Sequence, residues 1–272
     1  MSFSFALCSE VFKTPIEETF RTVAALGFQG IEIAPFNIAE SVEEVSAKRR
    51  REIRQAAEDV NLEILGLHWL LVSPSGLHLT TDDDGVRAKT INYLKALTHF
   101  CADLGGDFMV LGSPAQRNIA PKSDANAARA RAIDALRQVG PTLSERGVRL
   151  LLEALHPNET NFLQTIEEVE ALNVEIDHDQ ISYMLDCKAM SGMPDGIVGT
   201  IKKYGRTTGH FHANDPSGAG PGMGELAFAP VLDALSASGY KGWVSSEPFQ
   251  YEPDSETVAR TALQTLTAAQ AG

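Results

Sequence analysis

Four residues have the chemistry to hold a divalent metal ion together, because each one closes an apolar run that is typical of a β-strand. They are Glu153, Asp186, His212 and Glu247. Three carboxylates and one imidazole form an oxygen-rich donor set, which suits Mn²⁺, Mg²⁺ or Co²⁺ better than it suits a structural zinc ion. If the four strands are neighbours, these side chains meet at one end of a sheet. The pattern therefore predicts a metal centre, with Mn²⁺ as the expected ion.

Two histidines, His210 and His212, lie on the same predicted strand. Side chains two residues apart on a strand point to the same face, so both imidazoles reach the same side of the sheet. His212 is nearer the carboxyl end of the strand and is the predicted metal ligand. His210 is either an interior histidine with its own hydrogen bonds or a group that supports a ligand from behind.

The elements that must position these residues alternate along the whole chain. Strand-like runs cover residues 3–8, 30–33, 62–68, 108–112, 148–153, 181–186, 208–212 and 243–247, and amphipathic helical segments separate them. Eight βα units predict a single-domain (β/α)₈ TIM barrel over residues 1–272, with its chemical groups at the carboxyl ends of the strands. A doubly wound open sheet is the alternative, but no glycine-rich turn follows the first run.

Three sequence patterns predict where helices begin. Thr14-Pro15-Ile16-Glu17 has the order of a capping box, in which a threonine caps the helix and a glutamate three residues later returns the contact. Ser41 with Glu44 and Thr165 with Glu168 repeat the same pair.

Further polar and aromatic residues follow the predicted strands and so fall at the same mouth. Glu159 is either the cap of the next helix or a partner for a substrate hydroxyl. Glu32, His68 and Trp69 and the segment 112–117 are candidates for the pocket wall, although Trp69 also fits an ordinary core. The glycine-rich segment 218–225 matches neither GxGxxG nor a P-loop, so it predicts a loop that shapes the mouth.

Composition limits the partners and the compartment. The 272 residues include 23 Lys and Arg against 36 Asp and Glu, a formal charge of −13, which repels nucleic acid and anionic membranes. The three cysteines, Cys8, Cys101 and Cys187, are odd in number and widely spaced, which favours a reducing compartment. No signal peptide or membrane span is recognisable. We expect a cytoplasmic protein.

These motifs resemble those of the xylose isomerase-like TIM-barrel superfamily of sugar isomerases and epimerases, and most closely its D-tagatose and D-psicose 3-epimerase branch. The resemblance rests on LLEALHPNETNFLQT, MLDCKAM, GHFHAND, PGMGE and GYKGWVSSEPF. It implies a metal-dependent keto-sugar epimerase in which Glu153 and Glu247 also move protons on opposite faces of the sugar, through a cis-enediolate. It further implies a carbohydrate substrate, contacts from Glu159 and His156, and a homo-oligomer.

Two positions depart from the epimerase pattern. Ala189 stands where the branch has a histidine, and Gly218 stands where it has an arginine. Lys188 or Arg117 is expected to take over the contacts with substrate oxygens, and the alternative for either residue is a solvated surface charge. The departures keep open a keto-polyol isomerase, a lyase that eliminates from a 3-keto-glycoside, and a barrel that only binds. A DNA-repair nuclease of the same superfamily is disfavoured by the negative charge.

Overall fold

Eight short and largely buried strands alternate with helices along the chain, and all of them pair in parallel. The computed structural model describes residues 2–271. Each strand pairs with the next, and the eighth pairs with the first, which closes a barrel. The strands are β1 (Phe5–Cys8), β2 (Gly30–Ile33), β3 (Glu63–Leu67), β4 (Phe108–Leu111), β5 (Arg149–Glu153), β6 (Ile181–Asp186), β7 (Phe211–Ala213) and β8 (Val244–Ser246). The predicted (β/α)₈ barrel is confirmed, and the open sheet is wrong.

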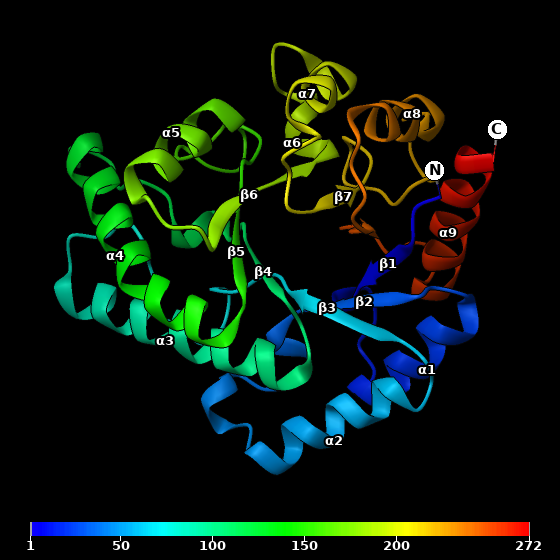
Figure 1. Ribbon diagram of the computed structural model, residues 1–272, viewed down its shortest axis with the longest axis horizontal. Helices are drawn as coiled ribbons and strands as arrows, with labels where there is room; N and C mark the ends of the chain where they lie inside the picture. Colours follow the sequence, from blue (N-terminus) through cyan, green and yellow to red (C-terminus); the bar gives the residue numbers. More distant parts are fainter. Residues whose placement is uncertain (1, 272) are drawn as a thin grey trace.

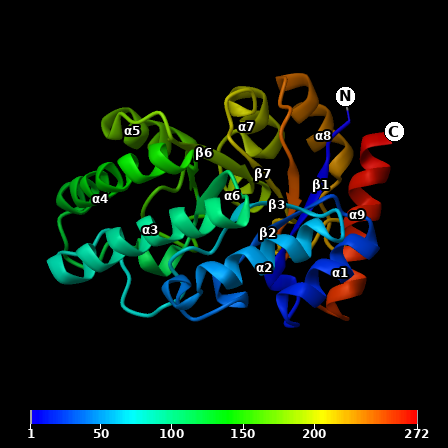
Figure 2. The ribbon, with the colours of Figure 1, turned by 60° about the horizontal axis from the view of Figure 1, so that its bottom comes forward.

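Helices surround the barrel on its outside (Figures 1 and 2). They are α1 (Ile16–Leu26), α2 (Ala47–Glu58), α3 (Asp84–Leu104), α4 (Ala125–Arg146), α5 (Ile166–Ile176), α6 (Cys187–Ser191), α7 (Gly196–Tyr204), α8 (Phe228–Ser238) and α9 (Ser255–Ala271). Short 3₁₀ helices are η1 (Ser9–Val11), η2 (Pro35–Asn37), η3 (Val42–Glu44) and η4 (Pro114–Gln116). The last helix, α9, packs on α1, β1 and β8. Within the described residues, no helix combines the length and apolarity needed to cross a bilayer.

The strands separate two buried clusters. The smaller cluster fills the barrel interior and consists of Ala6, Leu65, Phe108, Val110, Leu151 and Met184, with Trp243 against it. The larger cluster lies between the barrel and the helices, and it takes Leu150 and Leu152 from β5. Alternate residues of a strand therefore face opposite layers. Glu153 follows Leu151 by two positions, and Asp186 follows Met184 by two, so both acids continue the interior face at the carboxyl end.

Two of the expected runs, 30–33 and 181–186, coincide with β2 and β6, and the other six differ from the observed strands by one to three residues at an end. The seventh run, expected at 208–212, is strand only over Phe211–Ala213, so His210 precedes β7 and His212 lies within it. The eighth, expected at 243–247, is Val244–Ser246, and Glu247 is the first residue beyond it. In the register of the sheet His212 pairs with Asp186, the last residue of β6, while Ala213 pairs with Ser246, the last residue of β8.

One of the three predicted helix starts is confirmed, and two are wrong. Thr165 caps α5 by accepting a hydrogen bond from the Glu168 amide at 3.2 Å. Thr14 does not cap α1, because its hydroxyl is 3.0 Å from that of Thr19 while Pro15 occupies the cap position. Ser41 begins only η3, because Val45 is extended and interrupts the helix. The start of α2 is capped instead by Ser46.

Gly66 on β3 lies against the backbone of β4, so its substitution tests the packing of the barrel. A Cβ atom at Gly66 would come within 2.1 Å of the Phe108 carbonyl oxygen. We expect Gly66→Ala to lower the free energy of unfolding by about 1–3 kcal/mol, because neighbouring strands must move apart. Denaturant unfolding measures this change. Gly85→Ala in the exposed first turn of α3 is the matched control, and an equal loss there would contradict the explanation.

Candidate active site

The four predicted metal ligands converge at the carboxyl end of the barrel. Glu153 ends β5, Asp186 ends β6, His212 lies in β7 and Glu247 follows β8. One ligand atom from each lies within 4.8 Å of the others, and all four residues are buried. The structure thus brings together residues that are separated by up to 94 positions in the sequence, 247 minus 153. Their role as ligands remains a prediction that this proximity supports.

Burial and mutual repulsion make Glu153 and Asp186 hard to ionise without a cation. Burial raises the pKa of Glu153 well above its usual range, and the charges of Glu247 and Asp186 raise it further. Burial and Glu247 likewise raise the pKa of Asp186 to about 6. Buried charges need a partner, and His212 alone is one imidazole among three carboxylates. The donor set therefore fits a divalent ion with a preference for oxygen ligands.

Asp186 is held in place by two hydrogen bonds. Its Oδ1 accepts from the backbone amide of Ala189 at 2.7 Å, and its Oδ2 accepts from the Asn214 side chain at 2.6 Å. Asn214 in turn accepts from the Lys188 amide at 2.9 Å. The carboxylate therefore caps α6 while it faces the other acids. Sequence reasoning missed Asn214, although it follows His212 by two positions and so continues the same face of the chain.

His212 is oriented by carboxylates on both of its ring nitrogens. Its Nδ1 is 2.9 Å from Glu247 Oε2, and its Nε2 is 3.2 Å from Glu32 Oε2. Burial lowers the pKa of His212, but Glu247 and Glu32 outweigh burial and raise it well above the usual value. A carboxylate behind a histidine fixes which nitrogen carries the proton. Glu32 can therefore hold a proton on Nε2 and leave Nδ1 free for an ion.

Glu32 also binds His210, the residue directly before β7. Its Oε1 is 2.6 Å from His210 Nε2, which is a further 3.1 Å from the Ser245 hydroxyl. Burial opposes the ionisation of Glu32, yet His210 and His212 together hold its pKa well below the usual value. Burial lowers the pKa of His210. His210 therefore has its own hydrogen bonds in the interior and supports the ligand group through Glu32.

A cavity opens to solvent beside the ligand group, with about 380 Å³ of empty space that includes part of the open solvent. Three of the predicted substrate contacts, His68, Trp69 and Glu159, lie in its wall. Trp69 and Phe249 form an edge-to-face pair with ring centroids 6.1 Å apart. The wall is mostly apolar, with carboxylates on one side, which fits a ligand that has both apolar and hydroxylated surfaces. The lining residues are His68, Trp69, Val110, Gly112, Ser113, Pro114, Glu153, Leu155, Glu159, Glu247 and Phe249.

Gly112 provides the space for the Glu153 carboxylate. A Cβ atom at this position would come within 2.1 Å of Glu153 Oε2. Lys188 does not itself line the cavity, but its Nζ is 2.5 Å from Glu159 Oε1 and 4.9 Å from the centre of the Phe249 ring, and both of these residues do. Lys188 and Glu159 therefore form a paired donor and acceptor at the cavity that Glu153 and Glu247 also line.

Two predicted substrate contacts lie elsewhere. Arg117 is buried behind the wall, where its guanidinium donates to the backbone carbonyls of Leu111 at 3.3 Å, Glu153 at 2.6 Å and Leu163 at 3.3 Å. These bonds tie β4 to β5 and position Glu153 from its backbone. The ring of His156 accepts from the Asn158 amide at 3.2 Å. Neither side chain lines the cavity.

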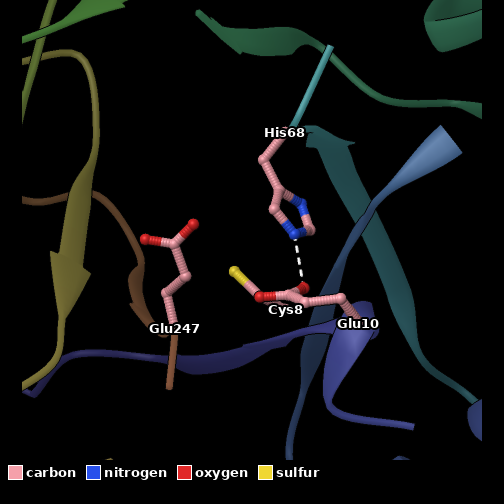
Figure 3. A group of neighbouring side chains, drawn as sticks. All are labelled: Cys8, Glu10, His68 and Glu247. Atoms are coloured by element: carbon pink, nitrogen blue, oxygen red, sulfur yellow. Dashed lines mark hydrogen bonds and ion pairs between the residues drawn. The ribbon is translucent and has the colours of Figure 1, made fainter. Parts of the chain in front are cut away.

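Sequence reasoning missed two features of the mouth. One is the pair of Cys8 and Glu10, and the other is Phe249. Cys8 ends β1 and Glu10 lies in η1 directly after it, and both face His68 and Glu247 (Figure 3). Burial of His68 lowers its pKa, but Glu10 at 2.5 Å outweighs burial and raises it. The position of Cys8, two residues after the interior-facing Ala6, was the available signal. Phe249 had a similar sequence signal, because it lies two residues after Glu247.

Comparison with known proteins gives a family from the sequence and a shared fold from the structure. A sequence profile for the family described as xylose isomerase-like TIM barrel matches residues 20–269. A D-psicose 3-epimerase from Ruminiclostridium cellulolyticum is 31% identical over 119 residues, which are 44% of this chain and 41% of that protein. The chain thus matches about two fifths of the length of this curated relative.

Two solved structures share the fold at low sequence identity. The crystal structure of D-psicose 3-epimerase with D-tagatose from Clostridium cellulolyticum H10 gives a TM-score of 0.85 at 20% identity, over 98% of this chain and 99% of that one. A 3-keto-D-glucoside 4-epimerase from Escherichia coli gives 0.85 at 19% identity, over 98% and 100%. These likenesses show a common barrel over nearly the whole chain.

The repulsion within the ligand group predicts opposite effects of Glu153→Gln with and without metal. In the metal-free protein the folded-state pKa of Glu153 is above its unfolded value, so the folded state binds more protons and loses stability as pH rises from about 4. We expect metal-free Glu153→Gln at pH 8 to exceed wild type in free energy of unfolding by on the order of 1–3 kcal/mol. The difference should shrink toward pH 5.

Adding Mn²⁺ should reverse this order, because a ligand that binds only the folded state stabilises it. Wild type should gain thermal stability, and Glu153→Gln should gain little. Differential scanning calorimetry with and without Mn²⁺ measures both effects. Glu159→Gln is the control, since Glu159 is outside the ligand group and should keep the wild-type response. A wild-type protein with no response to Mn²⁺ would contradict the metal site.

Proposed function

This chain belongs to the xylose isomerase-like TIM barrel family, and on that premise we propose that it is a divalent-metal-dependent epimerase or isomerase of a keto-sugar. The observation that carries the proposal is the convergence of Glu153, Asp186, His212 and Glu247, two of which, Glu153 and Glu247, line a partly apolar cavity. The epimerase relatives support the reaction class. The substrate is proposed to be a small carbohydrate with a carbonyl group.

We propose that Glu153 and Glu247 transfer protons at the carbon next to that carbonyl. They come from strands on opposite sides of the ligand group, so they can reach a substrate between them from two directions. As metal ligands both carboxylates would be ionised, which is the form that can accept a proton from carbon. A bound divalent ion, with Mn²⁺ as the proposed species, would polarise the carbonyl and make the neighbouring C–H bond more acidic.

The other residues of the cavity would bind and orient the sugar. Trp69, Leu155 and Phe249 cover the cavity with apolar surface, which excludes water from the reacting carbon. Lys188 and Glu159 offer a donor and an acceptor to sugar hydroxyls. Lys188 is therefore proposed to serve in place of the histidine and arginine that the epimerase branch has at Ala189 and Gly218. Arg117 is proposed to act indirectly, through the backbone of Glu153.

Replacing the two proton-transfer residues tests this reaction. We expect Glu153→Gln and Glu247→Gln each to slow exchange of the substrate α-proton in D₂O by about 10²–10⁴-fold, because an amide cannot take up the proton. NMR of D-psicose or D-tagatose with saturating Mn²⁺ measures the exchange, and metal content is measured in parallel. Glu225→Gln, in the exposed loop after β7, is the control. Wild-type exchange in both variants would end the mechanism.

Lys188→Met tests substrate positioning separately from chemistry. The variant keeps the length of the side chain but removes its charge, so we expect KM to rise about tenfold or more while the metal response stays intact. Lys203→Met is the matched control, because Lys203 lies on the exposed surface of α7 and pairs there with Glu167 of α5. Equal KM values in the two variants would remove Lys188 from the site.

The departures at Ala189 and Gly218 favour two alternatives within the same chemistry. A lyase acting on a 3-keto-glycoside, or a keto-polyol isomerase, would also begin by removing a proton next to a carbonyl. Elimination releases the aglycone as a separate product, whereas epimerisation conserves mass. Mass spectrometry of the products from a 3-keto-glycoside therefore separates these outcomes.

A further inference from the structure

A second group of metal-binding side chains lies beside the first. Cys8, Glu10, His68 and Glu247 are all buried, and one ligand atom from each lies within 4.8 Å of the others. We propose that these four residues form a second cation site, for a borderline divalent ion such as Zn²⁺ or Co²⁺. The proposal does not depend on the sugar chemistry.

The barrel brings these residues together from three strands. Cys8 is the last residue of β1 and Glu10 follows in η1, while His68 follows β3 and Glu247 follows β8. Because β1 pairs with β8, with Leu7 beside Ser246, the ends of these two strands are adjacent. Figure 3 shows the Cys8 thiol and the Glu10 carboxylate in the space between His68 and Glu247.

Hydrogen bonding leaves part of this group unsatisfied. Glu10 Oε2 is 2.5 Å from His68 Nε2, but Glu10 Oε1 is buried and has no hydrogen-bond partner among residues 2–271. Glu10 is only 7% exposed, so water does not readily replace the missing partner. A buried carboxylate oxygen without a donor is costly. A cation among the four donors would satisfy it.

The donor types indicate which ions fit. One thiol, one imidazole and two carboxylates form a softer set than the three carboxylates and one imidazole of the first group. Sulfur and nitrogen donors favour Zn²⁺ or Co²⁺ over Mg²⁺. Binding would form one sulfur–metal bond and release the thiol proton of Cys8 to solvent.

Glu247 belongs to both groups, which couples them. A carboxylate has two oxygens, so it can contact one ion with each, as bridging carboxylates do in two-metal sites. The first group keeps Glu153, Asp186 and His212 of its own, and the second keeps Cys8, Glu10 and His68. Each group can therefore be removed by substitutions that leave the other intact.

Cobalt loading of the full chain under reducing conditions tests the second site. We expect wild type to bind about two Co²⁺ per chain and to show a near-ultraviolet thiolate-to-cobalt charge-transfer band. Cys8→Ser should lose the band, and Glu10→Gln should weaken the second binding event by at least about tenfold. Isothermal titration and absorption spectroscopy give these readouts. Circular dichroism of each metal-free variant confirms that it is folded.

Two further variants test whether the charge-transfer band arises from Cys8 and the second site. Cys101→Ser removes another buried thiol, which donates to the Phe108 carbonyl away from the mouth, and should keep the band. Glu153→Gln should lose the first ion and proton exchange but keep the band. Binding of about one Co²⁺ by wild type without the band would overturn the second site, whatever the outcome for the proposed function. Retention of the band in Cys8→Ser would overturn it as well.

Discussion

The two-residue alternation of the strands is the constraint on which the whole mouth depends. On β5, Leu151 faces the barrel interior, Leu150 and Leu152 face the helices, and Glu153 returns to the interior. A shift of one residue would bury leucine in place of the acid and turn the acid toward the helical layer. The packing of ordinary leucines therefore determines where the carboxylate lies. The same holds on β6, where Met184 precedes Asp186.

The buried acids at the mouth lower the stability of the folded protein, and neighbouring hydrogen bonds offset only part of this loss. Asn214 and the Ala189 amide stabilise the charged form of Asp186, and two histidines stabilise that of Glu32. Among residues 2–271 the Glu153 side chain has no comparable donor, and its repulsion from Glu247 and Asp186 persists until a cation binds. Functional sites commonly retain such unfavourable arrangements, because the same charges that oppose folding bind the ligand. Arg117 supports this site from behind by holding the β5 backbone.

The barrel and the four converging side chains could be predicted from the sequence because both depend on local patterns. Apolar runs of four to seven residues mark strands, and a polar residue at the end of each of the last four marks the mouth. Helix starts were less predictable, since Thr14 has a capping sequence but bonds to Thr19 instead. Arg117 was expected near solvent and substrate, yet it is 1% exposed among carbonyls. Its partners come from three separate segments, so no local pattern could indicate them.

Glu10 shows most directly why part of the site lay beyond sequence reasoning. It lies in a short 3₁₀ helix after β1, where a glutamate is ordinarily a solvated residue, and its partner His68 is 58 positions away. Closure of the barrel brings β1 between β2 and β8, and this places Glu10 and Cys8 against Glu247. Glu247 therefore faces the first ligand group through His212 and the second through Cys8 and Glu10. A residue at that junction cannot change its charge or position without affecting both groups, which distinguishes Glu247 from Glu153.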